Sequence, residues 1–349
     1  MATATNDTPA MTDRPLLPAG APRHGGRFQN VLPIAPQGLR EMLGILWAMW
    51  TAKPATTVPN RPIPVHTIDP ATLPTVADGS LFRLGHSTVL LKLHGEFWLT
   101  DPVFAERASP FSFAGPRRFH APPIALDDLP PLRAVILSHD HFDHLDRDAV
   151  VRVAARTGTF VAPLGVGDRL AGWGVDPAKV RQLDWWEATT VGAVTLTAVP
   201  ARHFSGRTGR DRDRTLWTSW VIDAGASRIF FSGDTGYHEG FREIGARHGP
   251  FDVTLLENGG YDRRWPDVHM QPEQTLQAHL DLRGRWLLPV HNSTFDLAFH
   301  PWHEPLDRLL ALAAARGVDL ATPAIGARWS VAQPETGARW WRPLSAPDR

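Results

Sequence analysis

Short apolar runs recur along the chain from about residue 80 onwards. Val194–Val199 alternates larger apolar side chains with threonine and alanine, which is the period of a strand with one buried face. Further strand candidates are Leu81–Leu84, Val89–Leu93, Phe97–Thr100, Ala134–Leu137, Trp217–Ile222, Ile229–Ser232, Val253–Leu256 and Trp286–Pro289. The early candidates follow one another closely, as in hairpins.

Helical periodicity falls between the later strand candidates, at about residues 146–156, 238–248, 273–282 and 304–316. The last of these has Pro305 near its start and Gly317 at its end, which are typical first and last residues of a helix. Strands that come first as hairpins and then alternate with helices indicate an α/β or α+β fold and not an all-β barrel.

Composition divides the chain into three parts. Residues 1–30 are rich in polar residues and proline, and we expect a disordered tail. Residues 31–79 are expected to be an N-terminal helix (37–51) and a proline-rich connector (53–65) that pack on the domain. Residues 80–345 are expected to be the catalytic domain.

The most apolar N-terminal stretch is Met42–Trp50. It is too short to span a bilayer, which takes roughly 20 apolar residues. Either it packs on the domain, or it lies at a membrane surface with Trp47 and Trp50 among the lipid headgroups. Since the first residues show no secretory signal, the expected location is cytoplasmic, with peripheral membrane contact left open.

Charge and cysteine content limit the partners of the chain. The 349 residues include 36 Lys and Arg against 36 Asp and Glu, so there is no basic field of the kind that drives nucleic-acid binding, and no nucleic-acid partner is expected. The hydrophobic share of 43% allows a large core. There is no cysteine, so any metal must be bound by nitrogen and oxygen ligands.

Residues 138–146, SHDHFDHLD, follow the apolar run 134–137 and therefore lie on a loop that leaves a strand. Four side chains in this loop are potential metal ligands: His139, His141, Asp143 and His144. Imidazole together with carboxylate suits zinc, iron or manganese. The alternative is a solvated polar loop.

Three more candidate ligands each stand just past an apolar strand candidate. They are His203 in PARHFSGR, Asp234 in FFSGDTGY and His291 in LLPVHNSTF. Singly, each has an ordinary explanation as a hydrogen-bonded histidine or a turn aspartate. As a set with the loop 138–146, they indicate a metal centre at the ends of rigid strands.

The loop SHDHFDHLD resembles the HxHxDH signature of the metallo-β-lactamase superfamily, and the later order His, Asp, His is also that of the superfamily. This resemblance implies a four-layer αβ/βα sandwich with two metals at one edge, between the sheets. The implied ligands of one metal are His139, His141 and His203. Those of the other are Asp143, His144 and His291, and Asp234 bridges the two.

A closer resemblance is to the N-acylphosphatidylethanolamine-hydrolysing phospholipase D branch and its bacterial relatives. It rests on LGHSTVLL, LTDPVFAERASPFSFAGPRRF, PARHFSGR, RTLWTSWVI, GDTGY and HMQPEQTLQAHLDL, and it covers about residues 80–305. The chain departs from the branch at Asn292-Ser293, where the phospholipase has an aromatic residue and glycine. It departs again at residues 257–260, where ENGG replaces a more apolar stretch.

The resemblance implies a metal-dependent hydrolase, a phosphodiesterase of phospholipase D type. It would act on N-acyl phosphatidylethanolamine-like lipids through a hydroxide that bridges two divalent ions, expected to be Zn²⁺, with Mn²⁺ or Fe²⁺ as alternatives. The expected catalytic residues are Asp143, Asp234 and His269. The expected substrate-binding residues are His86 and His269, although His86 could instead close a strand turn and His269 could cap a helix.

Other side chains carry weaker expectations. Asp101 and Asp146 are expected to orient ligand imidazoles. The phosphate could be bound by arginines, and an acyl chain could lie against tryptophans, although a solvated loop and an aromatic core are the ordinary explanations. The arginines are Arg207, Arg210 and Arg212, and the tryptophans are Trp185, Trp186, Trp265 and Trp302.

Two other functions remain open on the sequence alone. A lactonase or amide hydrolase would use the same inner ligands on a carbonyl group, and a non-catalytic sensor would bind metal or lipid without turnover. The expected partner is a phospholipid or a small-molecule substrate, and a homo-oligomer is compatible with the sequence.

Overall fold

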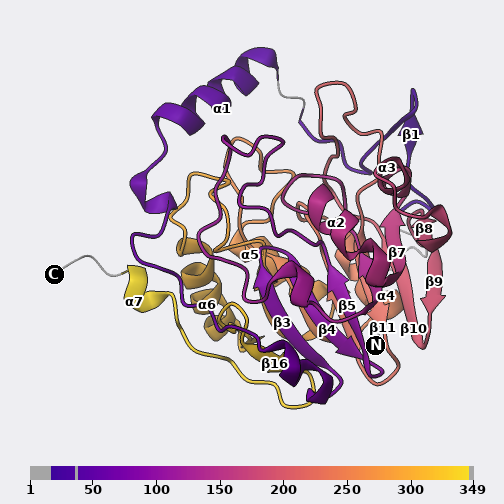
Figure 1. The fold of residues 1–349 in the computed structure, drawn as a ribbon. Coiled ribbons are helices and arrows are strands. Elements are labelled where there is room, and N and C mark those ends of the chain that lie inside the picture. The colour runs from indigo at the N-terminus through magenta and orange to yellow at the C-terminus, as the bar shows by residue number, and fades with distance from the viewer. Residues whose placement is uncertain (1–16, 36–37, 346–349) are drawn as a thin grey trace, which may run out of the picture.

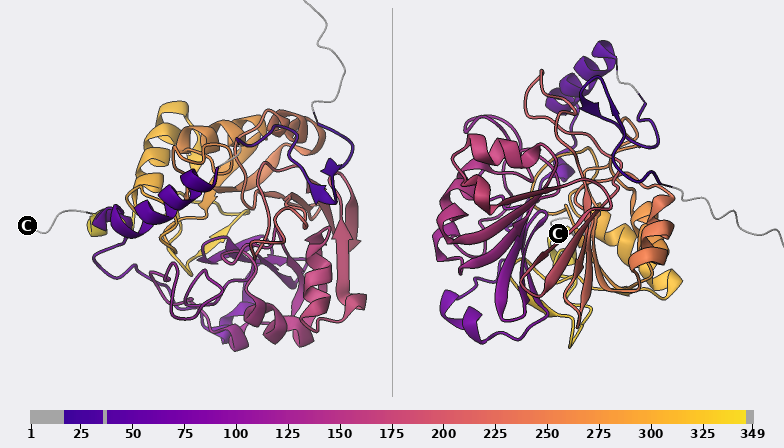
Figure 2. Two further views of the ribbon diagram at one scale, coloured as in Figure 1. Left: turned by 90° about the horizontal axis from the view of Figure 1, so that it is seen from above. Right: turned by 90° about the vertical axis from the view of Figure 1, so that its right-hand side faces the viewer.

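The computed structural model describes residues 17–35 and 38–345. Two seven-stranded β-sheets lie face to face, with helices on the outer face of each (Figures 1 and 2). The expected αβ/βα sandwich is therefore confirmed. Short 3₁₀ turns lie at Ala55–Thr57, Pro70–Thr75, Leu126–Asp128, Ala154–Arg156 and Pro177–Lys179.

The first sheet has the strand order β16-β3-β4-β5-β6-β7-β8. Its strands are β3 (Ser80–Gly85), β4 (Thr88–Leu93), β5 (Glu96–Thr100), β6 (Leu132–Ile136), β7 (Thr157–Pro163), β8 (Val180–Leu183) and β16 (Arg328–Ser330). The pairs from β16 to β5 are antiparallel, and those from β5 to β8 are parallel. Helices α2 (Arg147–Val153) and α3 (Val166–Gly172) cover its outer face.

The second sheet has the order β15-β14-β13-β12-β11-β10-β9. Its strands are β9 (Ala188–Val191), β10 (Val194–Val199), β11 (Ser219–Asp223), β12 (Arg228–Phe231), β13 (Phe251–Glu257), β14 (Gly284–Val290) and β15 (Asp319–Leu320). It also changes from antiparallel to parallel pairing, at β12. Its outer face carries α4 (Gly240–His248), α5 (Pro272–Asp281) and α6 (Glu304–Arg316), and α7 (Arg342–Ser345) lies near the C-terminus.

Each sheet is buried on both faces, by the other sheet on one side and by helices on the other. Successive side chains of a strand point to opposite faces and therefore enter different cores. In β4, Val89 and Leu91 point into the core between the sheets, whereas Leu90 points outward to the cluster under α2 and α3. Trp98 and Trp220, one from each sheet, are fully buried in the central core. Burial of a large apolar side chain contributes about 1.5–3 kcal/mol, so this core dominates the stability of the domain.

The strand and helix candidates from the sequence correspond closely to the observed elements. The sequence pattern missed the segment from β7 to β9, which includes α3. In β8 and β9 most side chains are half-buried or exposed, so the apolar alternation is weak there. These strands lie at the edges of their sheets.

The structure departs from the expected N-terminal tail. Residues 1–16 lie outside the described part of the chain, but residues 17–30 contact the domain. They include a small hairpin of β1 (Arg23–His24) and β2 (Arg27–Phe28), and Phe28 is buried against Trp185 and Trp217. The polar composition of this segment obscures its buried apolar residues, Leu17 and Phe28.

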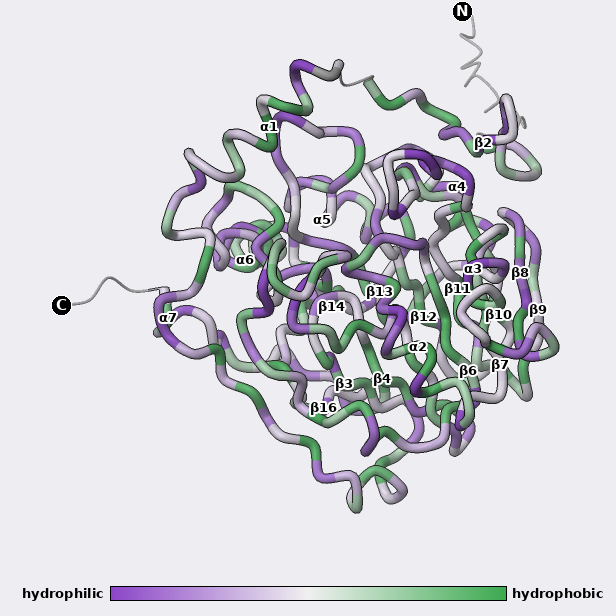
Figure 3. Tube along the Cα trace, turned by 45° about the horizontal axis from the view of Figure 1, so that its top comes forward, coloured by the Kyte–Doolittle hydropathy of each residue, from purple (hydrophilic) through white to green (hydrophobic). Residues whose placement is uncertain are grey.

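Helix α1 (Leu39–Thr51) stands at one end of the molecule, above the loops that join the strands (Figures 1 and 2). Figure 3 shows that it carries both hydrophobic and hydrophilic segments. Several of its large apolar side chains are exposed: Met42, Leu43, Leu46, Trp47 and Trp50. Within the described residues, no helix is long and apolar enough to cross a membrane.

Candidate metal centre

The loop 138–146 leaves the end of β6 and is fastened by the carboxylate of Asp101, which follows β5. Asp101 accepts hydrogen bonds from the Ser138 backbone N (2.7 Å) and the Ser138 hydroxyl (2.6 Å). It also accepts from Nδ1 of His144 at 2.7 Å. This fixes the proton of His144 on Nδ1 and leaves the lone pair of Nε2 facing the centre of the site.

The first cluster of candidate ligands contains His139, His141, His203 and Asp234, and its ligand atoms lie within 4.8 Å of one another. Nδ1 of His139 donates to Ser138 Oγ at 2.9 Å, because that hydroxyl already gives its proton to a carboxylate. Nδ1 of His203 donates to the Val268 carbonyl at 3.0 Å. Their Nε2 lone pairs both face Nδ1 of His141, at 2.9 and 3.2 Å, an arrangement that a cation would stabilise.

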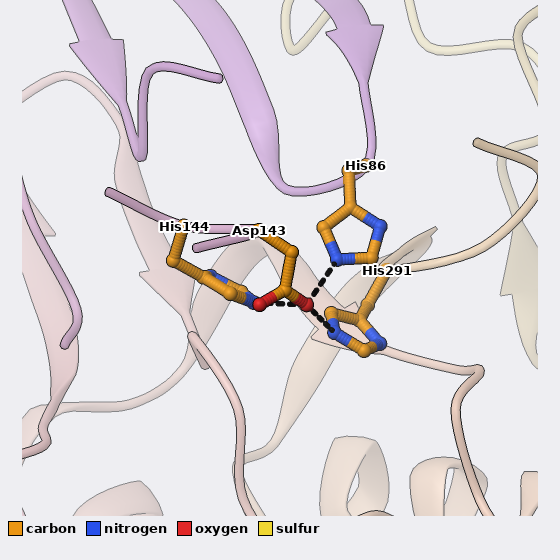
Figure 4. Close-up of side chains that lie close together, drawn as sticks. All are labelled: His86, Asp143, His144 and His291. Atoms are coloured by element: carbon orange, nitrogen blue, oxygen red, sulfur yellow. Dashed lines mark hydrogen bonds and ion pairs between the residues drawn. The ribbon is translucent and has the colours of Figure 1, made fainter. Parts of the chain in front are cut away.

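The second cluster contains His86, Asp143, His144 and His291 (Figure 4). Oδ2 of Asp143 lies 3.0 Å from Nε2 of His86, 3.4 Å from Nε2 of His291 and 3.6 Å from Nε2 of His144. Three chain segments far apart in sequence therefore present their polar atoms to one point.

Asp234 lies between the two clusters. Its Oδ1 is 3.0 Å from Nε2 of His144, and its Oδ2 is 3.1 Å from Nε2 of His291 and 3.7 Å from Nε2 of His203. Gly233 before it has φ +56°, and a Cβ there would lie 2.4 Å from Cβ of Ser138. Only glycine lets the chain approach the loop 138–146 closely enough to place this carboxylate between the two clusters.

The electrostatics of the site separates its histidines into two groups. Burial lowers the pKa of His139 and His203 well below the ordinary value, so both rings are neutral, which is the form that binds metal. Burial alone also lowers the pKa of His144 and His291. The Asp234 and Asp143 carboxylates outweigh it, and they raise the pKa of His291 to about 10 and that of His144 well above its ordinary value.

The buried atoms of the site fit divalent cations. Nε2 of His144, Nε2 of His291 and Oδ1 of Asp234 are buried and have no partner in hydrogen-bond geometry within the described chain. Buried polar atoms without partners are costly, and three that converge beside two carboxylates match the demands of metal ions. The structure thus brings together all seven side chains that the sequence indicated as ligands, in clusters able to hold metal.

His86 lies beside the candidate metal centre, in the second cluster. It follows β3 with φ 48°, and it is only 1% exposed. Its Nε2 faces Asp143, and it does not line the cavity described below. The structure places His86 in the second cluster, and its contact with substrate stays a prediction.

His269 lies beside the two clusters at the start of the segment before α5. Its ring stacks on that of His291 with centroids 5.0 Å apart, and its Nδ1 is 2.7 Å from Oε2 of Glu257. Burial raises the pKa of Glu257, and His269 acts against that rise. Together with Asp234 and His291, these two side chains form a third group of potential ligands.

A cavity of about 830 Å³ opens above the two clusters. Its polar floor contains His141, Asp143, His203, Asp234 and His269. One wall is the inner face of α1, with Met42, Ile45, Leu46 and Met49. The exposed arginines Arg212, Arg263 and Arg264 also line it. The cavity therefore joins an apolar wall, a cationic rim and a metal-binding floor.

Several of the weaker expectations find a structural explanation. Arg207 donates to the carbonyls of Asp140 and Leu145 and lies over the Phe142 ring, so it braces the loop 138–146. Asp146 accepts from backbone N–H groups of Phe104, Ala105 and the start of α2, and it orients no imidazole. Of the four tryptophans expected as possible contacts of an acyl chain, Trp265 lines the cavity.

The comparisons with known proteins agree with this geometry. Residues 98–292 match the beta-lactamase superfamily domain. An uncharacterised protein of Mycobacterium tuberculosis is 44% identical over 328 residues, covering 91% of this chain and 86% of that protein. The N-acyl-phosphatidylethanolamine-hydrolyzing phospholipase D 1 of Caenorhabditis elegans is 36% identical over 267 residues, covering 73% of this chain and 75% of that protein.

Solved structures share the fold at lower identity. A metallo hydrolase from the archaeon Ignicoccus hospitalis superposes with a TM-score of 0.55 at 22% identity, covering 71% of this chain and 96% of the other. At this identity the likeness concerns the fold alone.

Proposed function

This chain belongs to the metallo-β-lactamase superfamily of metal-dependent hydrolases, and on that premise we propose that it cleaves the phosphodiester bond of N-acylated phosphatidylethanolamine-like lipids. The products would be phosphatidic acid and an N-acylethanolamine. The observation that carries the proposal is the cavity, in which an apolar helix and three arginines stand over the metal-binding floor. The relative from Caenorhabditis elegans supports the same substrate class.

We propose two divalent ions, with Zn²⁺ as the first choice, because all the ligands are imidazole nitrogens and carboxylate oxygens. The proposed ligands of one ion are His139, His141 and His203. Those of the other are Asp143, His144 and His291, with Asp234 shared. Bound divalent ions in such a site acidify water and polarise a phosphoryl oxygen.

The side chains on the floor position the reactants. The Asp143 side chain is 15% exposed and lines the cavity, so its carboxylate can hold a metal ion where water enters. Asp234 is 3% exposed and aligns the histidines of both clusters. His269 presents one ring edge to the cavity, where it can hydrogen-bond to the phosphate or to the departing oxygen.

The walls match an amphiphile with an anionic head. Guanidinium groups bind phosphate oxygens through charge-assisted hydrogen bonds, and Arg212, Arg263 and Arg264 stand where a headgroup would enter. The methionines and leucine of α1 would contact acyl chains. A second cavity of about 1270 Å³ shares Leu46, Met49 and Leu297 with the first, so the two adjoin at α1 and offer room for more than one chain.

The outer face of α1 supports peripheral contact with a membrane. Trp47 and Trp50 are 65% and 82% exposed, and their rings pack edge to face at 6.0 Å. Tryptophan favours the boundary between headgroups and acyl chains, because it has an apolar body and one polar N–H. A helix with this face on a bilayer and its other face on the cavity would place the site next to the lipid surface.

A substrate panel tests the proposal. The zinc-reconstituted protein is assayed on vesicles that contain N-acyl phosphatidylethanolamine, a short soluble phosphodiester, a lactone and a β-lactam. We expect the lipid phosphodiester to give the highest kcat/KM. If a lactone or β-lactam gives the highest kcat/KM, the protein is a hydrolase that attacks carbonyl groups and the phosphodiesterase function is wrong. If no substrate is turned over, a metal or lipid sensor is favoured.

A further inference from the structure

Glu257 is a fully buried carboxylate next to the candidate metal centre. It ends β13, at the edge where the parallel strands of the second sheet deliver their polar side chains. Its Oε1 accepts a hydrogen bond from the Met270 backbone N at 2.6 Å, and its Oε2 lies 2.7 Å from Nδ1 of His269. Each carboxylate oxygen therefore faces one nitrogen of the segment that carries His269.

These contacts determine which atom of His269 reaches the cavity. With Nδ1 turned to the buried carboxylate, the opposite ring edge, with Nε2, faces the cavity that His269 lines. Within the described residues, no protein partner hydrogen-bonds to Nε2. The ring also lies against the rings of His203 and His291, at 5.2 and 5.0 Å between centroids, so its plane is fixed as well.

We propose that Glu257 is a positioning residue for His269: it keeps a proton on Nδ1 and thereby presents the Nε2 lone pair to the substrate. This inference rests on the phosphodiesterase function proposed above. It adds a role for a residue outside the seven metal ligands, and it assigns the proton of His269 to one ring atom.

Metal ligation is the competing role for Glu257, because it belongs to a group of four potential ligands. The geometry favours a hydrogen bond. A contact of 2.7 Å between Oε2 and Nδ1 is the length of a charge-assisted hydrogen bond, and the other oxygen is held by the Met270 N–H. Oε2 is 3.8 Å from Nδ1 of His291, and that ring presents Nε2, not Nδ1, to the clusters.

The proposed proton transfers balance over the reaction. The attacking water gives one proton to Nε2 of His269 as its oxygen bonds to phosphorus. The ester P–O bond on the ethanolamine side then breaks, and the departing alkoxide takes that proton from Nε2. Glu257 stabilises the intervening imidazolium through Nδ1–H, and the ring returns to its first state.

The Glu257→Gln variant tests the inference, because it changes chemistry with little change in shape. The amide oxygen can keep the hydrogen bond from Met270, but the NH₂ group then faces Nδ1 of His269 and must donate to it. The proton of His269 would therefore move to Nε2. An isosteric side chain preserves the packing, so the variant should fold.

Nitrogen-15 NMR of the histidine side chains at pH 8, in the zinc-loaded protein, reports the ring tautomer directly. The His269 signals are assigned by their loss in His269→Gln. We expect a protonated Nδ1 in the parent protein and an unprotonated Nδ1 in Glu257→Gln. An unprotonated Nδ1 in the parent, or an unchanged spectrum in the variant, would overturn the inference, whatever the substrate proves to be.

Kinetics adds a second readout. We expect Glu257→Gln to lower kcat about 10–100-fold with little change in KM, in zinc content or in melting temperature. The double variant Glu257→Gln/His269→Gln should be no slower than His269→Gln alone, because Glu257 acts through His269. Glu187→Gln, at an exposed turn, is the matched control. Loss of zinc in Glu257→Gln, or additive losses in the double variant, would contradict the positioning role.

If none of the phosphodiesters is hydrolysed but the NMR result is as expected, the proposed function fails and the tautomer assignment stands. If phosphodiesters are hydrolysed and the tautomer does not change, the positioning role fails and the function stands.

Discussion

Nδ1 of His144 lies 2.7 Å from Oδ2 of Asp101, and both side chains are fully buried. The Asp101 carboxylate also accepts hydrogen bonds from the backbone N–H and the hydroxyl of Ser138. Asp101 therefore fixes both the start of the loop 138–146 and the tautomer of His144 within it. Such outer partners fix the tautomer and orientation of a ligand imidazole and thereby raise its affinity for metal.

We therefore expect Asp101→Asn to weaken zinc binding about 10–100-fold. The amide can still accept from the Ser138 N–H, but its NH₂ group would face Nδ1 of His144 and drive the proton of that ring to Nε2, the atom that faces the cations. Competition with a chelator of known affinity measures the loss. Asp148→Asn, at an exposed position on α2, is the control and should bind zinc like the parent protein.

The purified protein should carry about two transition-metal ions per chain, since its two clusters share one carboxylate. Elemental analysis measures the ratio, and dialysis against a chelator should abolish turnover, with recovery on addition of Zn²⁺. A protein that contains no metal as isolated and takes up none on reconstitution would falsify the dinuclear centre.

Asp234→Asn and His139→Ala should each reduce turnover at least about 100-fold while the fold is retained. Asp234 is the carboxylate between both clusters, and His139 belongs to the first. Both stand at strand ends outside the apolar core, so melting temperatures of the metal-free variants should stay close to that of the metal-free parent. Near-parental turnover in either variant would remove that residue from the centre.

The pattern of apolar residues was sufficient to predict most strands and helices and an α/β or α+β fold, as at the alternating strand β10, whereas the sandwich itself was implied by the resemblance of the loop 138–146 to the superfamily signature. The seven candidate ligands could be found for a related reason. They come directly after strands, where short polar motifs stand out against apolar runs, as at His203 after β10 and at Asp234 after β12.

Other parts of the site could not be found in this way. Glu257 stood out only as part of residues 257–260, which depart from the branch, and its role follows from a segment 12 residues later in the chain. The sequence left His86 open between a substrate contact and the closure of a strand turn, because its burial depends on the packing of Asp143 and Phe295 around it. Asn30 lies in a segment without hydrophobic periodicity, and its hydrogen bonds to the backbone of His203 are seen only in the folded chain.

Asn30 fixes the backbone of a candidate ligand. Its Nδ2 donates to the His203 carbonyl at 2.6 Å, and its Oδ1 accepts from the His203 N–H at 3.0 Å and from the Trp217 indole at 3.1 Å. Asn30→Ala removes these partners, but Trp217 keeps the Ala201 carbonyl as an acceptor and water can reach the half-buried position, so the net cost is that of about one unpaired polar group, about 1–3 kcal/mol.

We expect Asn30→Ala to lower the free energy of unfolding by about 1–3 kcal/mol in urea denaturation and to weaken zinc binding as well. Asn60→Ala, at an exposed asparagine, is the matched control. A variant as stable as the parent, with equal zinc affinity, would show that the side chain of Asn30 is dispensable for the centre.

The exposed face of α1 gives the last prediction. If Trp47 and Trp50 enter a lipid surface, the double variant Trp47→Ser/Trp50→Ser loses burial worth about 1.5–3 kcal/mol for each side chain that becomes fully buried there. Since 1.4 kcal/mol corresponds to tenfold in affinity, vesicle binding should fall at least about tenfold. Hydrolysis of a short soluble diester should be unchanged, because neither tryptophan lines the cavity over the metal-binding floor.

Point variants separate this effect from a loss of folding more cleanly than removal of residues 1–52, because such a truncation would also remove Phe28 and Asn30, which pack on the domain. Co-sedimentation with vesicles, rates on both substrates and melting temperature are measured together. Val151→Ser, at an exposed apolar residue of α2, is the control for a general loss of surface hydrophobicity. Equal losses on the vesicle and the soluble substrate, or unchanged vesicle binding, would mean that α1 serves only as a wall of the cavity.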